Sequence, residues 1–97
     1  MLEKSIETKI KDYLNSMGFY VLKLHASPFM PKGIPDIITC QDGNFLAIEV
    51  KRTNAKNTQR KAQKVNQKMI EKAKGVYLLV DTLEEVVEYV EKQREIL

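Results

Sequence analysis

Hydrophobic residues recur at helical spacing near the start of this chain, and Gly18 follows the last of them. The positions concerned are Leu2, Ile6, Ile10, Tyr13, Leu14 and Met17. Apolar residues three and four apart share one face of a helix, and glycine commonly ends one. The pattern predicts a first helix over residues 3–17, with Glu7 at the border of its apolar face.

Three runs rich in branched and aromatic residues follow, over residues 19–25, 34–40 and 45–51. A loop with two prolines and a glycine separates the first two runs, and Asp42-Gly43 is at the centre of the second connection. Asp-Gly between apolar runs is a strong signal for a β-hairpin. We therefore expect an antiparallel meander whose second and third strands form a hairpin.

Helical spacing returns after a polar connection, with Asn57 or Thr58 as the expected N-cap. The apolar stripe of this second helix consists of Ala62, Val65, Met69, Ile70 and Ala73, and Lys74-Gly75 ends it. Residues 76–80 are an uninterrupted apolar run, typical of a central strand that is covered on both faces.

Thr82 and Glu85 have the spacing of a capping box for a last helix. A right-handed crossover should make the fourth strand parallel to the third. The expected fold is thus α/β, in one domain over residues 1–97, with the order α-β-β-β-α-β-α and a mixed four-stranded sheet flanked by helices.

The net charge of +3 is unevenly distributed. Residues 51–74 contain nine Lys or Arg and one acid, Glu71. Such a block is expected of a protein that binds a polyanion, although a solvated lysine-rich helix has the same charge.

The chain shows neither an apolar signal core nor an 18-residue apolar window, and its lone Cys40 is expected to be a small core residue. We expect a cytoplasmic protein of a bacterial, archaeal or phage-infected cell, with no membrane partner.

Two acidic residues interrupt the predicted hairpin strands at similar distances from Asp42-Gly43. Asp36 and Glu49 should therefore lie nearly opposite each other at the open end of the hairpin, with Lys51 on the same face as Glu49. Two carboxylates can hold a hard divalent cation such as Mg²⁺, and the Val50 carbonyl can join them. Lys51 can orient water or stabilise developing negative charge. The alternative is a salt-bridge cluster of the three charged side chains.

These residues resemble a known family. Gly33-Ile34-Pro35-Asp36 with Glu49-Val50-Lys51 is similar to the motif of the PD-(D/E)xK nuclease superfamily, and the small chain resembles its virus-type replication-repair nuclease (VRR-Nuc) domain. Lys23-Leu24-His25-Ala26-Ser27 resembles the family's Lys-x-His-x-Ser segment, and Glu7 has the family's spacing to Gly18. The resemblance covers nearly the whole chain and implies a restriction-endonuclease-like core.

Carried over by position, the resemblance implies the following site. Metal ligands would be Glu7, Asp36, Glu49 and the Val50 carbonyl; catalytic residues would be Asp36, Glu49, Lys51 and a glutamine of the second helix. The connection at residues 52–57 lacks the family's usual glycine and proline. Gln63 is preferred as that glutamine because of its spacing to Gly75, and Gln59 is the alternative.

Other candidates lie around this site. Basic residues expected to meet DNA phosphates are Lys32, Arg52, Lys56, Arg60, Lys61 and Lys64. His25 and Ser27 are further candidates for phosphate contacts, with a structural histidine and an ordinary polar loop as the alternatives.

The sequence thus predicts a Mg²⁺-dependent DNA endonuclease, with Mn²⁺ able to substitute, that recognises branched, flap or junction DNA by shape. A homodimer is expected, with Phe29 and Met30 as candidate interface residues. The alternatives are a Holliday-junction resolvase-type nuclease, a catalytically idle nucleic-acid-binding module, and an interaction protein that docks through its acidic last helix.

Overall fold

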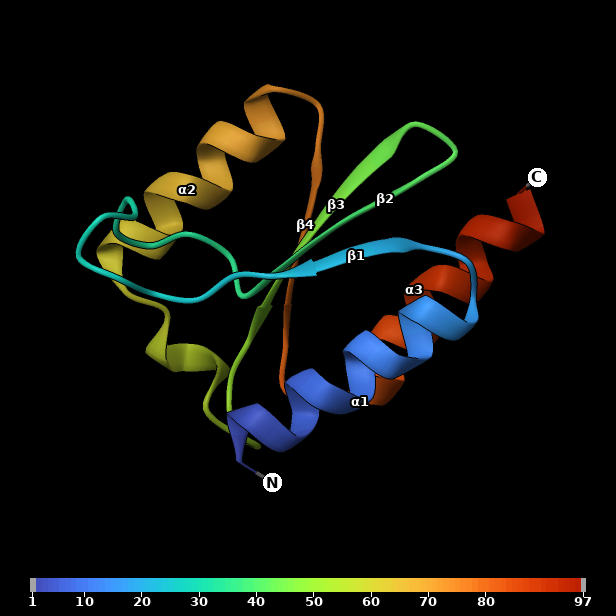
Figure 1. The fold of residues 1–97 in the computed structure, drawn as a ribbon, viewed down its shortest axis with the longest axis horizontal. Coiled ribbons are helices and arrows are strands. Elements are labelled where there is room, and N and C mark those ends of the chain that lie inside the picture. The colour runs from blue at the N-terminus through green and yellow to red at the C-terminus, as the bar shows by residue number, and fades with distance from the viewer. Residues whose placement is uncertain (1, 97) are drawn as a thin grey trace.

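The computed structural model describes residues 2–96, and its elements follow the expected order (Figure 1). They are α1 (Glu3–Ser16), β1 (Tyr20–Lys23), β2 (Ile37–Gln41), β3 (Asn44–Val50), a 3₁₀ turn (Lys56–Thr58), α2 (Lys61–Lys72), β4 (Val76–Val80) and α3 (Leu83–Ile96). The predicted α/β fold with a mixed four-stranded sheet is confirmed. No helix within the described range combines the length and the apolar character that crossing a membrane requires.

The sheet has the order β1-β2-β3-β4, so that each strand pairs with the next one in the chain. β2 is antiparallel to both β1 and β3, whereas β4 is parallel to β3. Asp42 and Gly43 close the β2–β3 hairpin with φ angles of 55° and 78°. Positive φ at both central residues is the signature of the turn that matches strand twist. The predicted hairpin and the predicted parallel crossover are both confirmed.

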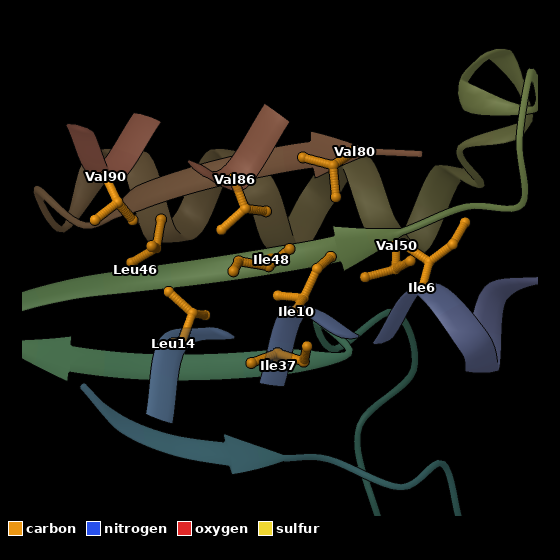
Figure 2. Packing of buried hydrophobic residues seen from close by; sticks show 10 residues of the cluster. All are labelled: Ile6, Ile10, Leu14, Ile37, Leu46, Ile48, Val50, Val80, Val86 and Val90. Atoms are coloured by element: carbon orange, nitrogen blue, oxygen red, sulfur yellow. The ribbon is translucent and has the colours of Figure 1, made fainter. Parts of the chain in front are cut away.

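Helices cover both faces of this sheet. α1 and α3 lie side by side on one face, and α2 lies on the other, where it packs against β4 (Figure 1). The main core lies between the sheet and the α1–α3 pair (Figure 2). Its buried members are Ile6, Ile10, Leu14, Ile37, Leu46, Ile48, Val50, Val80, Val86 and Val90. Because alternate residues of β3 face this core, Ala47 and Glu49 face the α2 side.

The prediction of a central fourth strand is wrong, because β4 is an edge strand. Its apolar run has a different cause. α3 packs on one face of β4 and α2 on the other, so that Val80 and Tyr77 are buried on opposite faces. Two covering helices therefore give an edge strand the composition of a central one. The capping box of Thr82 and Glu85 at the start of α3 is confirmed by hydrogen bonds in both directions.

The predicted N-cap of the second helix is also wrong. α2 begins at Lys61 with Arg60 at the N-cap, while Asn57 and Thr58 belong to the 3₁₀ turn. Moreover, the apolar stripe of α2 is only partly covered, since Val65 is 50% and Met69 65% exposed.

Cys40 is exposed, contrary to the expectation of a core residue. It pairs with Tyr20 of β1 and Phe45 of β3, and both of these aromatic residues are exposed as well. α2 covers the β4 side of this sheet face and leaves the part formed by β1 and β2 open. Tyr20, Leu22, Cys40 and Phe45 form what we call the open sheet face.

Candidate active site

Asp36 and Glu49 lie near each other at the open end of the hairpin. Ile37 pairs with Ile48, which is the last pair of the β2–β3 ladder. The Asp36 backbone N–H donates a hydrogen bond to the carbonyl of the same Ile48 at 3.1 Å. The Asp36 carboxylate also accepts a hydrogen bond from the Val50 backbone N–H at 2.7 Å. Asp36 precedes the first residue of β2, and these two hydrogen bonds with β3 hold it at the end of the hairpin.

Lys51 follows β3 and has its side chain on the α2 side of the sheet. Its backbone N–H donates to the Val80 carbonyl at 2.8 Å, which ties it to β4. Its Nζ lies 3.4 Å from a Glu49 carboxylate oxygen and donates to Gln63 Oε1 at 3.1 Å. Lys51 is only 5% exposed. Two partners from two different elements therefore hold a buried ammonium in one position.

The two candidate glutamines have different partners. Gln63 Oε1 accepts a hydrogen bond from Lys51 and another from the Arg60 backbone N–H at 2.7 Å, so it links the start of α2 to the site. Gln59 lies before α2 and donates instead to the Tyr77 hydroxyl at 3.3 Å and to Gln67 Oε1 at 3.0 Å. Of the two, Gln63 is the one that contacts Lys51.

Glu49 is buried without adequate hydrogen bonding. It is 1% exposed, and among residues 2–96 neither of its carboxylate oxygens has a partner at hydrogen-bonding geometry. Burial, followed by repulsion from Asp36, raises the pKa of Glu49 to about 7, although Lys51 and the Tyr77 hydroxyl oppose this rise. Burial raises the pKa of Asp36 as well, against the hydrogen bond from Val50. A bound cation would offset the free-energy cost of keeping these buried carboxylates charged.

Glu7 reaches the same region from α1. It is buried, and one of its carboxylate oxygens lies 3.8 Å from Lys23 Nζ. Burial and the nearby Asp36 raise its pKa, while Lys23 lowers it. No three His, Cys, Asp or Glu side chains in the described part of the chain come close enough together to hold one ion. Asp36 is near both other acids, because its charge raises the pKa of Glu7 and that of Glu49.

The donor set fits a hard divalent cation. Carboxylate oxygens are the ligands that Mg²⁺ and Mn²⁺ favour, and the Glu49 carboxylate is buried without a completed hydrogen bond within residues 2–96. A buried charge of this kind is normally paired or bound to a metal. The Lys51 ammonium, 3.4 Å from Glu49, compensates the negative charge of this carboxylate only in part, because it also interacts with the charge of Asp36.

Residues 3–94 match the family model described as archaeal Holliday junction resolvase (hjc). The chain belongs to the Hjc family. None of the curated proteins searched matches it. This family membership supports a nuclease that acts on DNA, and the superfamily resemblance seen in the sequence is confirmed.

Two solved structures share the fold of this Hjc-family chain. One, a VRR_NUC domain, has a TM-score of 0.74 at 21% identity, with 92% of this chain and 94% of the other covered. The second, a VRR_NUC domain protein, has a TM-score of 0.75 at 18% identity, with 94% and 86% covered. At these identities the likeness shows the fold alone, which is the restriction-endonuclease-like core expected from the motif.

The loop between β1 and β2 of the Hjc-family chain docks on α2. The Lys32 carbonyl accepts a hydrogen bond from the Asn66 side chain at 3.0 Å. Gly33 lies so close to α2 that a Cβ there would be 2.4 Å from the backbone carbonyl of Ala62. His25 and Ser27 are exposed at the start of this loop, and the Ser27 hydroxyl accepts a hydrogen bond from the Phe29 N–H at 3.2 Å.

The predicted basic residues fall into two groups. Those with exposed side chains are Lys32, Arg52, Arg60, Lys61 and Lys64. Lys56 differs, because its ammonium is paired with Glu85, whose carboxylate also accepts hydrogen bonds from the Asp81 and Thr82 backbone. Lys56 therefore has a structural partner at the start of α3 that the other basic residues of the set lack among the interactions described.

Sequence reasoning missed Tyr77. This residue is 7% exposed, and its hydroxyl lies between Gln59 and Glu49. Burial and the negative charge of Glu49 raise its pKa, so the phenol stays protonated. A tyrosine inside an otherwise aliphatic strand was the available signal, since a buried tyrosine hydroxyl usually has a polar partner.

A cavity of about 410 Å³ lies at the other end of the sheet. Its walls include Phe19, Phe45, Tyr89 and Arg94, and none of the candidate catalytic residues lines it. The carboxylates are instead grouped where β3 ends.

Proposed function

We propose that the chain is a metal-dependent endonuclease that hydrolyses phosphodiester bonds of branched DNA, with four-way junctions as the preferred substrate. The observation that carries the proposal is the buried Glu49 carboxylate, which has no completed hydrogen bond within residues 2–96 and lies near Asp36 and beside Lys51. The match to the archaeal Holliday junction resolvase family supports the choice of substrate.

Asp36 and Glu49 would hold Mg²⁺, or Mn²⁺ in its place, with Glu7 and the Val50 carbonyl as the further ligands that the resemblance implies. A bound divalent cation lowers the pKa of water and neutralises charge on a phosphate. The Val50 N–H fixes one oxygen of Asp36 and so orients that carboxylate. Glu49 lies in β3, Asp36 directly precedes β2, and Glu7 lies in α1, so regular elements position all three acids.

Lys51 acts on the scissile phosphate. Gln63 accepts one of its three ammonium hydrogens and Glu49 lies beside a second, which leaves one for an oxygen of the phosphate or of the attacking water. A positive charge that is held in place before the reaction stabilises developing negative charge without reorganisation. Burial strengthens this effect, because the effective dielectric constant is lower than in water.

The exposed basic residues around the start of α2 contact the DNA backbone. Lys32, Arg60, Lys61 and Lys64 surround the point where the β1–β2 loop docks on α2, which is also where Gln63 reaches Lys51. Phosphate contacts position a protein on DNA without reading its sequence. Branched DNA would then be recognised by the arrangement of its duplex arms and not by its base sequence.

A second copy of the chain is the proposed protein partner. Separating a four-way junction into two duplexes requires two incisions, and each copy has one site. Exposed apolar side chains supply a surface for this pairing, which we call the apolar α2-side surface. It consists of Tyr20, Leu22 and Phe45 on the open sheet face, Val65 and Met69 on α2, and Phe29 and Met30 in the docked loop.

The deciding experiment is a cleavage assay on linear, flap and four-way DNA with Mg²⁺, Mn²⁺ or EDTA. Wild-type protein should cut the four-way substrate with either metal and not with EDTA. Asp36→Asn and Lys51→Met should each lose on the order of a hundredfold or more in rate. Asp42→Asn, at the far end of the same hairpin, is the matched control and should cut normally. Wild-type rates in Asp36→Asn would refute the site.

The idle binding module is the second candidate, and the Lys51–Glu49 ion pair favours it. In that case the two charges compensate each other and no cation is needed. The same assay separates the two functions, because an idle module would bind every substrate and cut none of them with either metal.

A further inference from the structure

Tyr77 links the site to the surface through a series of polar side chains. It is on β4, paired with Ala47, and therefore lies on the same sheet face as Glu49. Its hydroxyl accepts a hydrogen bond from Gln59, whose amide also donates to Gln67 Oε1. Gln67 in turn donates to the Glu71 carboxylate at 3.4 Å.

The chemistry of the last member sets the direction of the whole series. An ionised carboxylate only accepts hydrogen bonds, so Gln67 must turn its NH₂ group toward Glu71. Its carbonyl oxygen then faces Gln59, which must offer its own NH₂ group in return. The Tyr77 oxygen consequently accepts from Gln59, and the single hydrogen of the phenol remains for an acceptor on the other side. The neighbouring acceptor on the same sheet face is Glu49, which interacts with the Tyr77 hydroxyl and has no completed hydrogen bond among residues 2–96.

We propose that Tyr77 is a positioning residue for Glu49, and that Gln59 keeps the phenol hydrogen directed at that carboxylate. In that arrangement the phenol completes a hydrogen bond to one Glu49 oxygen, neither of which has such a bond among residues 2–96, and the other oxygen remains for the cation. This inference rests on the proposed metal-dependent function, and it assigns to Gln59 a role different from that of Gln63.

Loss of the Tyr77 hydroxyl should weaken the binding of the cation. Removing a hydrogen-bonding partner of a metal ligand typically costs ten- to a hundredfold in metal affinity or activity. Tyr77→Phe retains the ring and its packing but removes the donor, so we expect about tenfold weaker Mn²⁺ binding. DNA binding without metal should be unchanged, since Tyr77 is buried beneath α2.

Gln59→Glu provides an independent test. It keeps the size of the side chain but replaces a donor by an acceptor, so the phenol hydrogen can turn toward residue 59 and away from Glu49. We expect Mn²⁺ affinity to fall about tenfold here too. The double variant with Tyr77→Phe should be no worse than the single Tyr77→Phe, because both changes remove the same hydrogen bond.

The experiment is a Mn²⁺ titration of the full chain without DNA, with free Mn²⁺ followed by electron paramagnetic resonance. Tyr89→Phe is the matched control, since Tyr89 is partly buried and packs against the core on the opposite face of the sheet. Thermal unfolding and metal-free DNA binding are recorded for every variant.

Weakened Mn²⁺ binding in Tyr77→Phe and Gln59→Glu, with Tyr89→Phe unchanged, supports the proposal. Wild-type affinity in both variants overturns it, as does an equal loss in Tyr89→Phe. If Tyr77→Phe does not fold, Gln59→Glu alone decides. Asp36→Asn separates this question from the proposed function: if it binds Mn²⁺ as the wild type does, the metal site itself is refuted, whereas its failure to bind leaves the role of Tyr77 to be judged on its own variants.

Discussion

The ionised form of Glu49 lowers the stability of the folded chain. Its pKa is raised from 4.5 to about 7 by burial and by Asp36, with Lys51 and Tyr77 acting in the opposite sense. Between these two pH values the folded chain therefore binds more protons than the unfolded chain. Stability must fall as the pH rises through this window, and it levels off above it.

Without added metal, the melting temperature should decrease between about pH 5 and pH 7.5, and Glu49→Gln should remove most of that decrease. The full effect of the Glu49 shift is about 3 kcal/mol, and Asp36 and Glu7 add to it with the same sign. Calorimetry at several pH values measures it. Glu88→Gln, at an exposed ion pair on α3, is the control and should follow the wild type. A melting temperature that rises over this range would contradict the predicted sign.

At the scale of elements, the docking of the β1–β2 loop on α2 brings together two segments that supply candidate DNA contacts. Gly33 makes the docking possible. It has a φ of 78°, and any side chain there would collide with the backbone of Ala62.

Gly33→Ala should cost about 2–4 kcal/mol, through both left-handed backbone strain and the collision. Gly43→Ala is a matched control, because Gly43 also has a φ of 78° but a Cβ there would meet nothing within 4 Å. It should cost about 1 kcal/mol, from backbone strain alone. Urea unfolding measures both values, and equal losses in the two variants would show that the collision is relieved at no cost.

The elements that the sequence predicts well are those whose signals are local. Asp42-Gly43 determines the hairpin, and the hairpin brings Asp36 and Glu49 to the same open end without further information. What failed depends on tertiary packing. The edge position of β4 is hidden because two helices cover it, and Cys40 is exposed because α2 covers only part of its sheet face.

The same distinction applies to the candidate site. Gln63 and Gln59 are both compatible with helical spacing, and only the path of the chain through the 3₁₀ turn decides which of them meets Lys51. Tyr77 carries no motif, so its neighbours could be known only from the parallel pairing of β3 and β4. Contacts between elements far apart in the sequence were the missing information.

At the scale of the whole molecule, the exposed apolar side chains are concentrated on one side. Apart from Leu2, the large hydrophobic residues that are exposed in the described chain belong to the apolar α2-side surface, and Phe29 is 95% exposed. Exposed apolar surface of this kind is typical of interfaces. The opposite side of the sheet is covered by α1 and α3 (Figure 1).

Met69→Glu should therefore convert a dimer into a monomer, because it places a charge on the surface that pairing would bury. Light scattering after size-exclusion chromatography at micromolar concentration measures this change. Lys68→Glu, on the next residue of the same helix, alters charge without touching the apolar residues and should leave the dimer intact. A wild-type protein that is monomeric under these conditions would refute the dimer, and a dimeric Met69→Glu would refute this surface.

The two-residue turn at Asp42-Gly43 also has a consequence for the order of folding events. Short loops close fastest, and contacts between residues near in sequence form before distant ones. Only two residues separate β2 from β3, so this strand pair has the shortest connection in the sheet. The pairing of β4 with β3 requires the crossover through α2 and should form later. Asp36 and Glu49 should thus meet early, while both are still hydrated. Lys51 and Tyr77 should complete their surroundings only when α2 and β4 arrive.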